Sequence, residues 1–498
     1  MRQFMLFPKK FALALHTGIL LTILATTGLA NDLKIENVHF IHRPETTGEM
    51  RAMLDLSWQN AWHSNRNHDA AWIFLKFIYP NGNGYAHATL ASDGHRALAV
   101  PGSEAPPAQI EVSEDRTGFF IYATKPHRGA VQWRVSVQLD TTAYQQRFRQ
   151  ARLEAYGIEM VYIPEGPFTL GDPGSAALNF GAFYKSDDNG QPNGLIRVNS
   201  EAEISVGNIS GQLYYQSQTQ DYQGDQLGPV PAAFPKGFQA FYLMKYELNQ
   251  GQYAGFLNTL SDEATFELFT FGGRSYFDKR GTIRLEGHKY VAGRPQRPLN
   301  FSSWDGGLAF ADWAALRPMT ELEYTKASRG PETPKAGEFP WGTASRDRLA
   351  REVGPDDELG MTNDWEESKL TDQTREVFGA SYYWVMDLAG SVWERVITIG
   401  KPDGRAFQGS HGDGRLGERS HATNDDWPHD YAGKQGHGYR GGGFYDQGMR
   451  VHEFNPHSPI AYRRYGAWSG AFPSKAYGFR CARTAPSRFK ACETKKIP

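Results

Sequence analysis

A strict alternation of apolar and polar residues between 131 and 139 constrains the fold of this chain most strongly. In VQWRVSVQL the apolar positions are Val131, Trp133, Val135, Val137 and Leu139. A period of two is the pattern of a strand with one face on a core and the other in water. The segment MLDLSWQ repeats this pattern, and AAWIFLKFIYP and GFFIYATKP are short apolar runs bounded by turn residues. Residues 33–142 are therefore predicted to form an antiparallel β-sandwich.

Composition and charge narrow the class of protein. The 498 residues are 40% hydrophobic and 13% aromatic, which is enough for two or three domains with cores of their own. The 53 basic and 55 acidic residues are scattered along the chain and give a formal net charge of -2. A nucleic-acid-binding surface needs clustered basic residues, so nucleic acid is not an expected partner.

The first 30 residues have the form of a secretory signal peptide. Three basic residues precede the apolar run FALALHTGILLTILATTGLA, and the small Ala30 permits cleavage before Asn31. Cleavage predicts an exported protein, periplasmic or extracellular, with no membrane span. An uncleaved anchor is the alternative, because the run approaches the roughly 20 residues of a spanning helix.

Changes in composition divide the rest of the chain. We predict a linker at 143–157, a second domain at 158–486 and a C-terminal tail at 487–498. The segment 174–236 is rich in Gly, Asn, Gln and Ser, which predicts a long surface insertion in the second domain.

Capping signals predict the helices of the second domain. Asn249 precedes a helical stretch, and Ser302 with Asp305 has the spacing of a capping box. Thr320 and Glu323 repeat that spacing, so both are expected to have a structural role.

The segment MDLAGSVWERV, residues 386–396, places Asp387 and Glu394 around an Ala-Gly-Ser bend and a tryptophan. The two carboxylates either cap and solvate an ordinary turn or converge, with carbonyls of the bend, on a cation. Calcium is the cation that such oxygen donors suit.

Seven motifs occur in the order and spacing of one protein family. They are MVYIPEGPFTLGD, FYLMKYELNQGQYAGFLN, RPLNFSSWDGGLAFADWAALRPMTELEYTKASRG, FPWGT, MDLAGSVWERV, YRGGGF and YGFRCART. Through these motifs residues 158–486 resemble the formylglycine-generating enzyme, or sulfatase-modifying factor, family. The resemblance implies a compact α+β fold related to C-type lectins, with little regular structure and with bound calcium.

The resemblance also implies where calcium binds. Carried over by position, the side chains of Asp387 and Glu394 are calcium ligands, and the carbonyls of Gly390 and Val392 complete this part of the shell. A salt-bridged turn remains the alternative. The family's second calcium site is not assigned in this sequence.

The family's oxidases use two cysteines that hold copper(I), between the Gly-Gly and Gly-Phe-Arg motifs. By position, Asp446 and Val451 stand where those cysteines would be. Neither side chain is a soft ligand for copper(I), so copper is not expected and the oxidase activity is expected to be lost.

The chain has two cysteines, Cys481 and Cys492. They either form a disulfide in an oxidising compartment or are free thiols. By resemblance, Cys481 is a structural cysteine whose usual partner is replaced by Ser328, which leaves Cys492 as the candidate partner.

The loop 409–430 lies, by resemblance, near the family's substrate groove. The candidates for ligand contact there are His411, Asp413, Arg415 and Trp427. A polar, glycine-rich surface loop without a ligand is the alternative. Outside this loop, Arg440 and Arg480 match family arginines that are expected to pair with buried carboxylates or carbonyls.

Two functions from different classes are compatible with the sequence. The first is an exported, non-catalytic family member that binds a peptide, glycan or envelope partner through a calcium-stabilised domain. The second is an oxidoreductase that holds a non-haem metal through His411, Asp413 and a neighbour. The missing copper-binding cysteines favour the first.

Overall fold

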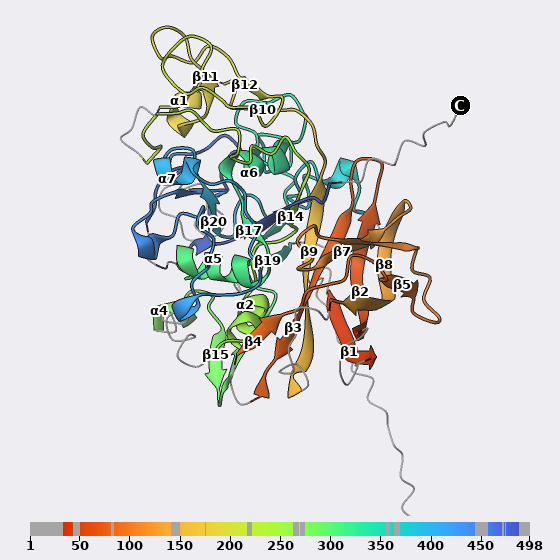
Figure 1. Ribbon diagram of the computed structural model, residues 1–498. Helices are drawn as coiled ribbons and strands as arrows, with labels where there is room; N and C mark the ends of the chain where they lie inside the picture. The colour runs from red at the N-terminus through yellow and green to blue at the C-terminus, as the bar shows by residue number, and fades with distance from the viewer. Residues whose placement is uncertain are drawn as a thin grey trace, which may run out of the picture.

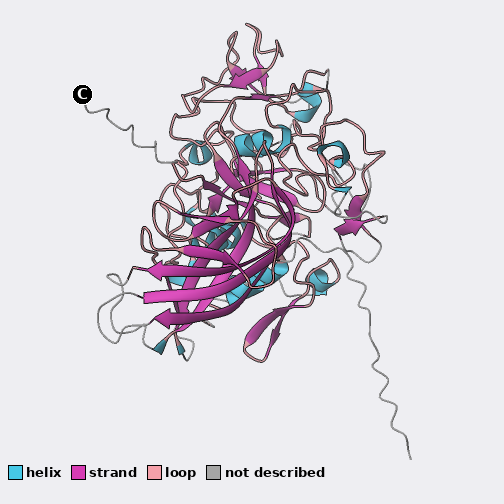
Figure 2. Cartoon of the chain, turned by 90° about the vertical axis from the view of Figure 1, so that its right-hand side faces the viewer, coloured by secondary structure: helices cyan, strands magenta, loops and turns pink. Residues whose placement is uncertain are grey.

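The computed structural model describes residues 33–42, 50–80, 84–140, 150–174, 176–216, 222–261, 268, 274–354, 359–362, 369–443, 457–470, 473 and 475–487. The fold is mixed α and β, with many strands and few short helices (Figures 1 and 2). Figure 1 shows the long N-terminal strands, coloured red to orange, on one side of the molecule and the loop-rich remainder beside them. In the described part of the chain, no helix is long and apolar enough to cross a membrane. The signal peptide predicted at residues 1–30 lies outside the described residues.

One antiparallel sheet has four strands in the order β1-β2-β8-β5. The strands are β1 (Lys34–His42), β2 (Met50–His63), β8 (His127–Leu139) and β5 (Arg96–Ala99). The predicted alternation is present in β8, where the apolar residues from Val131 to Leu139 are buried and the polar ones between them are partly or fully exposed.

A second antiparallel sheet extends from the N-terminal region into the C-terminal region. Its strand order is β17-β23-β14-β9-β3-β7-β6, with β4 paired to β3. The strands are β17 (Arg317–Pro318), β23 (Cys481–Thr484), β14 (Phe241–Met244), β9 (Arg152–Ile163), β3 (Asp69–Ile78), β7 (Phe119–Ala123), β6 (Ala108–Val112) and β4 (Tyr85–His87). β3 and β9 pair without a register shift from Asp69 opposite Val161 to Ile78 opposite Arg152.

The linker predicted at 143–157 is wrong where the structure describes it. Residues 152–157 belong to β9, which pairs with β3 on one side and with β14 on the other. This end of β9 carries the polar residues Arg152 and Glu154, which pair with each other near the surface. Arg152 Nε lies 3.0 Å from Glu154 Oε1. These polar positions gave the strand end the appearance of a connecting segment. Residues 143–149 lie outside the described residues.

β3 is buried on both faces. One set of its residues shares a core with the apolar residues of β2 and β8: Ala71, Ile73, Leu75 and Phe77. The alternate set belongs to the core of the C-terminal region: Ala70, Trp72 and Phe74. A strand covered on both sides needs apolar residues at successive positions, which explains the unbroken apolar run in its sequence.

The C-terminal region consists of short elements joined by long loops. Its helices are α1 (Ala177–Phe180), α2 (Gln250–Leu257), α4 (Arg274–Phe277), α5 (Trp304–Trp313), α6 (Glu321–Arg329) and α7 (Pro402–Arg405), with 3₁₀ turns at Asp372–Thr374, Glu418–Ser420 and Asp430–Ala432. The remaining strands are β10 (Phe168–Leu170), β11 (Tyr184–Lys185), β12 (Ile196–Val198), β13 (Leu213–Tyr214), β15 (Ile283–Glu286), β16 (Lys289–Ala292), β18 (Arg351–Val353), β19 (Leu359–Met361), β20 (Trp393–Ile397), β21 (His437–Arg440) and β22 (Tyr477–Gly478).

The insertion at 174–236 is only partly a surface segment. It carries α1 and β11 to β13, and Figure 1 shows these elements at the top of the molecule, away from the long N-terminal strands. Six of its aromatic and aliphatic residues are nevertheless buried in the main core: Phe183, Val198, Leu213, Tyr215, Val230 and Phe234.

Two helix caps follow the sequence prediction and one differs. Asn249 caps α2 and Thr320 caps α6, each as part of a capping box. Ser303 caps α5, one residue later than predicted. Asp305 is not part of that cap, because its carboxylate accepts the backbone N–H groups of residues 430 and 431.

A buried lysine joins β3 to the C-terminal region. Lys76 Nζ lies 2.6 Å from the carbonyl oxygen of Trp313 and 2.9 Å from that of Gly414. It also lies 2.8 Å from His87 Nδ1. Because His87 Nε2 contacts the carbonyl of Thr117 at 2.6 Å, Nδ1 is left as the acceptor. Burial lowers the pKa of Lys76, yet all three contacts need a hydrogen on Nζ, which the ammonium form supplies. The side chain thereby fixes α5 and the loop 409–430 against β3.

Replacing Lys76 with methionine removes the donor from three buried acceptors. We expect Lys76→Met to lower the free energy of unfolding by about 3 kcal/mol or more, measured by urea titration of the full chain. Lys289→Met, at an exposed position of β16, is the control and should stay within about 0.5 kcal/mol of the parent. Equal stability of the two variants would show that the Lys76 contacts do not hold the regions together.

Candidate functional site

The segment 386–396 forms a tight turn that leads into β20. Its backbone is left-handed at Asp387 (φ 60°), Gly390 (φ 92°) and Ser391 (φ 60°). At Gly390 an added Cβ would lie 2.7 Å from the ring of His457. The turn therefore needs glycine at this position both for its backbone conformation and for space.

Asp387 is held in an ion pair. Arg351 of β18 donates from Nε to Oδ1 at 2.8 Å and from Nη2 to Oδ2 at 2.9 Å. The Asp387 side chain is 8% exposed and the Arg351 side chain is 12% exposed. Both carboxylate oxygens of Asp387 are thus engaged by one guanidinium, which ties the turn to β18.

Glu394 is fully buried against Arg480. The guanidinium donates to Glu394 Oε1 from Nε at 2.9 Å and from Nη2 at 2.5 Å. Arg480 also donates to the carbonyls of Met244 and Met386. Among the described residues, the buried Glu394 Oε2 has no hydrogen-bond partner. Burial raises the pKa of Glu394, and the Arg480 charge opposes that rise.

A third carboxylate, Glu247, lies beside these two pairs and was not identified from the sequence. Its Oε1 accepts the backbone N–H of Val392 at 3.1 Å, whereas its buried Oε2 has no partner in the part of the chain that the structure describes. Burial, with the charges of Asp387 and Glu394 nearby, raises the pKa of Glu247 well above its usual range. Glu247 lies between the end of β14 at Met244 and the Asn249 cap of α2, so its position resembled that of an ordinary helix-start residue.

The arrangement has room for a further positive charge. Three buried carboxylates face two arginines, and the Oε2 atoms of Glu247 and Glu394 lack partners. Uncompensated buried carboxylates are costly, so a bound cation would fit here. Of the two predicted side-chain ligands, Glu394 has an unpartnered oxygen among the described residues, whereas both oxygens of Asp387 are engaged by Arg351. In the described part of the chain, no three His, Cys, Asp or Glu side chains are grouped to hold a metal ion, and calcium stays a prediction.

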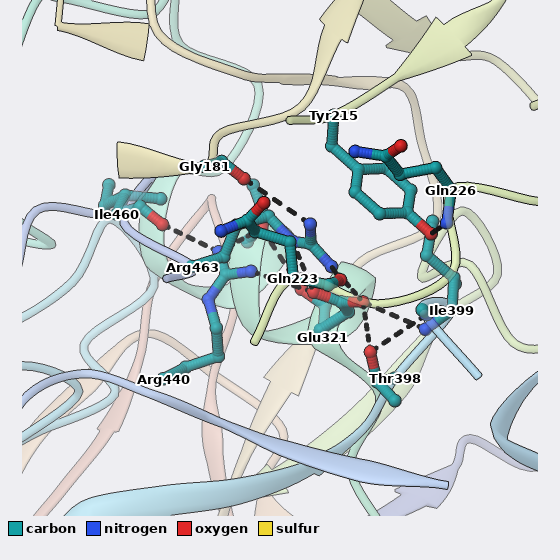
Figure 3. Close-up of polar contacts among 12 residues, drawn as sticks. Gly181, Tyr215, Gln223, Gln226, Glu321, Thr398, Ile399, Arg440, Ile460 and Arg463 are labelled. Atoms are coloured by element: carbon teal, nitrogen blue, oxygen red, sulfur yellow. Dashed lines mark hydrogen bonds and ion pairs between the residues drawn. The ribbon is translucent and has the colours of Figure 1, made fainter. Parts of the chain in front are cut away.

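Arg440 belongs to a separate buried cluster around Glu321, the first residue of α6 (Figure 3). Glu321 Oε1 accepts from Thr398 Oγ1 and from the N–H of Ile399, both at 2.9 Å. Its Oε2 accepts from Arg440 Nη1 and Arg463 Nε, both at 3.1 Å. One carboxylate therefore joins segments that are far apart in the sequence.

Glu323 connects the same helix to the second sheet. Arg317 of β17 donates to both of its oxygens, at 2.6 and 2.9 Å. Glu323 Oε2 also accepts the backbone N–H of Thr320 at 3.0 Å, which completes the capping box. Thr320 and Glu323 thus have the structural role in a helix cap that the sequence predicted.

The four candidates in the loop 409–430 do not lie together. Trp427 is fully buried in the main core and donates its Nε1–H to the carbonyl of Ser410, so its indole is unavailable to a ligand. His411 lines a cavity, whereas the exposed Asp413 and Arg415 are outside that lining.

His411 and Asp413 differ in their surroundings. His411 Nε2 accepts the backbone N–H of Thr484 at 3.0 Å, and burial with the charges of Arg483 and Arg317 lowers its pKa well below the usual range. The histidine is therefore neutral. Asp413 Oδ1 instead accepts the N–H of the residue two positions later, as in an ordinary polar turn.

Besides Glu247, sequence reasoning missed four residues of these networks: Arg317, Arg351, Glu321 and Arg463. Arg351 lies between the FPWGT and MDLAGSVWERV motifs, in a loop that carries no family motif, and Glu321 and Arg463 are separated by 142 positions. Nothing local in the sequence pairs them. The helix cap beside Glu321 was the only available signal.

Removing the charge of Glu321 should leave two buried arginines without their shared partner. We expect Glu321→Gln to lower the free energy of unfolding by about 3–5 kcal/mol in chemical denaturation of the full chain. Glu332→Gln, at an exposed position just after α6, serves as the control and should have little effect. A Glu321→Gln protein as stable as this control would contradict the structural role of the cluster.

Comparisons with known proteins agree with the motifs. The family model described as "Sulfatase-modifying factor enzyme 1-like domain" matches residues 146–485. The formylglycine-generating enzyme of Bos taurus is 24% identical over 201 residues, which cover 35% of this chain and 53% of that protein. The chain thus spans about half the length of this curated relative. Because the family model covers more than half of the chain, the protein belongs to the sulfatase-modifying factor, or FGE-sulfatase, family.

Proposed function

We propose that the protein is an exported, non-catalytic member of its family that binds a peptide, glycan or envelope partner through a calcium-stabilised domain. The observation that carries the proposal is the state of its cysteines. The chain has two, and neither stands at the positions where the resemblance places copper-binding thiolates. Those positions, Asp446 and Val451, and also Cys492, lie outside the described residues.

Cys481 is unsuited to replace the missing pair. It lies in β23, is fully buried in the main core, and burial raises the pKa of its thiol. A thiolate is the form that binds copper(I) and reacts with oxidants, so a buried, protonated thiol supports neither role. The disulfide considered between Cys481 and Cys492 stays a prediction.

Two adjoining cavities support a binding role. The larger, about 660 Å³, is lined by Tyr162, His411 and Arg483 among others, and the smaller, about 220 Å³, extends toward the insertion. Both are lined by Gln239, Ala240 and Thr484, so they adjoin along the end of β23. A groove of this size suits a short peptide or a sugar.

The alternative, an oxidoreductase with other metal ligands, has less support. It required His411 and Asp413 to share a metal, but His411 Nε2 is engaged by Thr484 and Asp413 is exposed outside the cavity that His411 lines. No observation on the described residues favours this function over binding.

The oxidase activity provides the first test. The mature protein, loaded with copper(I) and given a sulfatase-type cysteine peptide, should form no formylglycine, because the thiolates that activate oxygen are missing. Mass spectrometry of the peptide measures the aldehyde, and a formylglycine-generating enzyme in the same assay serves as the positive control. Aldehyde above the level without enzyme would overturn the non-catalytic proposal.

Calcium dependence provides the second test. A ligand that binds only the folded state stabilises it by about 2.7 kcal/mol at 100 times its dissociation constant, so chelator should lower the melting temperature. Glu394→Gln should abolish the difference between calcium and chelator. Asp387→Asn should keep the difference while losing the pair with Arg351.

The parent protein tests calcium binding without any variant. Calcium retained by the parent protein after dialysis, measured by elemental analysis, reports the site even where Glu394→Gln fails to fold. A parent protein that retains no calcium and melts identically in calcium and chelator would show that the calcium proposal is wrong.

A further inference from the structure

The hairpin formed by β15 and β16 extends past the core of the molecule. Its two four-residue strands pair from Ile283 opposite Ala292 to Glu286 opposite Lys289, with a two-residue turn between them. Ile283 is buried in the main core, whereas Leu285, two positions nearer the turn on the same face, is 56% exposed. The hairpin therefore leaves the core between these two residues, and Figure 1 shows β15 at the lower end of the molecule, below α2.

Three large apolar side chains are exposed on or beside this hairpin. They are Phe277, at the end of α4, Leu285 and Val291. Val291 lies opposite Arg284 in the strand register, and the Arg284 guanidinium lies over the Phe277 ring, 5.5 Å from its centroid. Phe277, Arg284 and Val291 are therefore neighbours on one face of the hairpin, and Leu285 lies on the other. Exposed apolar side chains that gather at one place mark a contact with another molecule or with a membrane.

Basic side chains outnumber acidic ones around these apolar residues. Over residues 277–294, six charged side chains are exposed or half-exposed, four basic and two acidic: Lys279, Arg284, Lys289, Arg294, Asp278 and Glu286. The whole chain, by contrast, has a formal net charge of -2. The hairpin region is thus locally positive on a slightly negative protein, and a partner of complementary charge is negative.

The size of the hairpin favours a lipid surface over a protein as that partner. A stable protein interface takes about 800 Å² and roughly 20–30 residues from each side. The hairpin, with its two four-residue strands, is smaller than such a patch. A bilayer accepts a small projecting element, because its apolar side chains enter the acyl boundary while its basic side chains stay at anionic headgroups.

We propose that the β15–β16 hairpin binds the surface of an anionic phospholipid membrane. Leu285 and Phe277 enter the boundary between headgroups and acyl chains, and Arg284 and Lys289 lie at the phosphates. Contact of this kind is peripheral and reversible, because a few side chains rather than a spanning segment enter the bilayer. The hairpin is apart from the groove of the proposed function, so either proposal stands if the other fails.

Co-sedimentation of the full mature chain with large vesicles tests the proposal. One set of vesicles is an equal mixture of phosphatidylglycerol and phosphatidylcholine, and the other is phosphatidylcholine alone. Each Lys or Arg near an anionic surface strengthens binding about fivefold, so the anionic vesicles should bind the protein at least tenfold more tightly. The difference should shrink in about 0.5 M NaCl, because salt screens exposed charges. Equal binding to both sets would overturn the proposal.

Reversing two exposed charges of the hairpin tests its electrostatic part. Arg284→Glu combined with Lys289→Glu should weaken binding to the anionic vesicles at least tenfold. The matched control is Arg96→Glu combined with Lys125→Glu, which reverses two exposed basic residues of the N-terminal region and should weaken binding by about threefold at most. Equal weakening by the two double variants would assign the effect to net charge alone and would contradict the proposal.

A change of one exposed leucine tests whether apolar side chains enter the lipid. Leu285→Ser should weaken binding at least fivefold, because apolar surface that leaves water on binding is lost. Leu98→Ser, at an exposed position of β5, is the control and should bind like the parent. Binding that is unchanged in Leu285→Ser would show that the hairpin does not enter the bilayer.

A nucleic acid is the competing anionic partner. A double-stranded DNA oligomer should bind the protein much more weakly than the anionic vesicles do, because it offers no apolar phase to Leu285 and Phe277. DNA binding that is as tight as vesicle binding, and that is lost when Arg284 and Lys289 are replaced by glutamate, would assign the hairpin to nucleic acid and overturn the proposal. All the substituted side chains are exposed, and the melting temperature of each variant checks that it folds like the parent.

Discussion

The pairing of β3 with β9 is the interaction on which the rest of the structure depends. It extends from Asp69 to Ile78 on β3 and unites the N-terminal strands and the C-terminal region in one sheet. β3 then contributes apolar side chains to two cores, one on each face. Phe74, for example, packs edge-on against Trp313 of α5 at 5.1 Å between ring centroids. Because the sheet continues across the boundary, the N-terminal strands are an integral wall of the family region rather than an attached module.

Buried arginine–carboxylate pairs supply the order that regular structure does not. The longest described helix of the C-terminal region, α5, has 10 residues, and helices this short are not stable on their own. Glu321 and Glu394 each hold at least one arginine from a distant segment, and Glu323 holds Arg317 of the neighbouring β17. Breaking such a pair leaves a buried charge without a partner, so each pair strongly disfavours alternative loop arrangements. The calcium prediction concerns the turn beside these pairs, where the Oε2 atoms of Glu247 and Glu394 have no partner among the described residues.

Local patterns predicted local structure, and they failed where contacts are long-range. The alternation in β8, the caps at Asn249 and Thr320, and the family motifs were all readable from the sequence. The continuation of β9 through 152–157 was not, since its polar residues at the strand end hid the period. Trp427 was assigned to a ligand groove because the family resemblance places its loop there, yet its indole is buried in the core. Glu247 carried no signal at all, because its importance comes from residues more than 100 positions away.

The central claim is that the N-terminal strands and the family region form one cooperative unit. Scanning calorimetry of the full mature chain tests this most directly. A single transition, whose calorimetric enthalpy equals its van't Hoff enthalpy, is the result expected for one unit that shares a sheet and two cores. Two resolved transitions, or a calorimetric enthalpy well above the van't Hoff value, would show that the regions unfold independently and would contradict the claim.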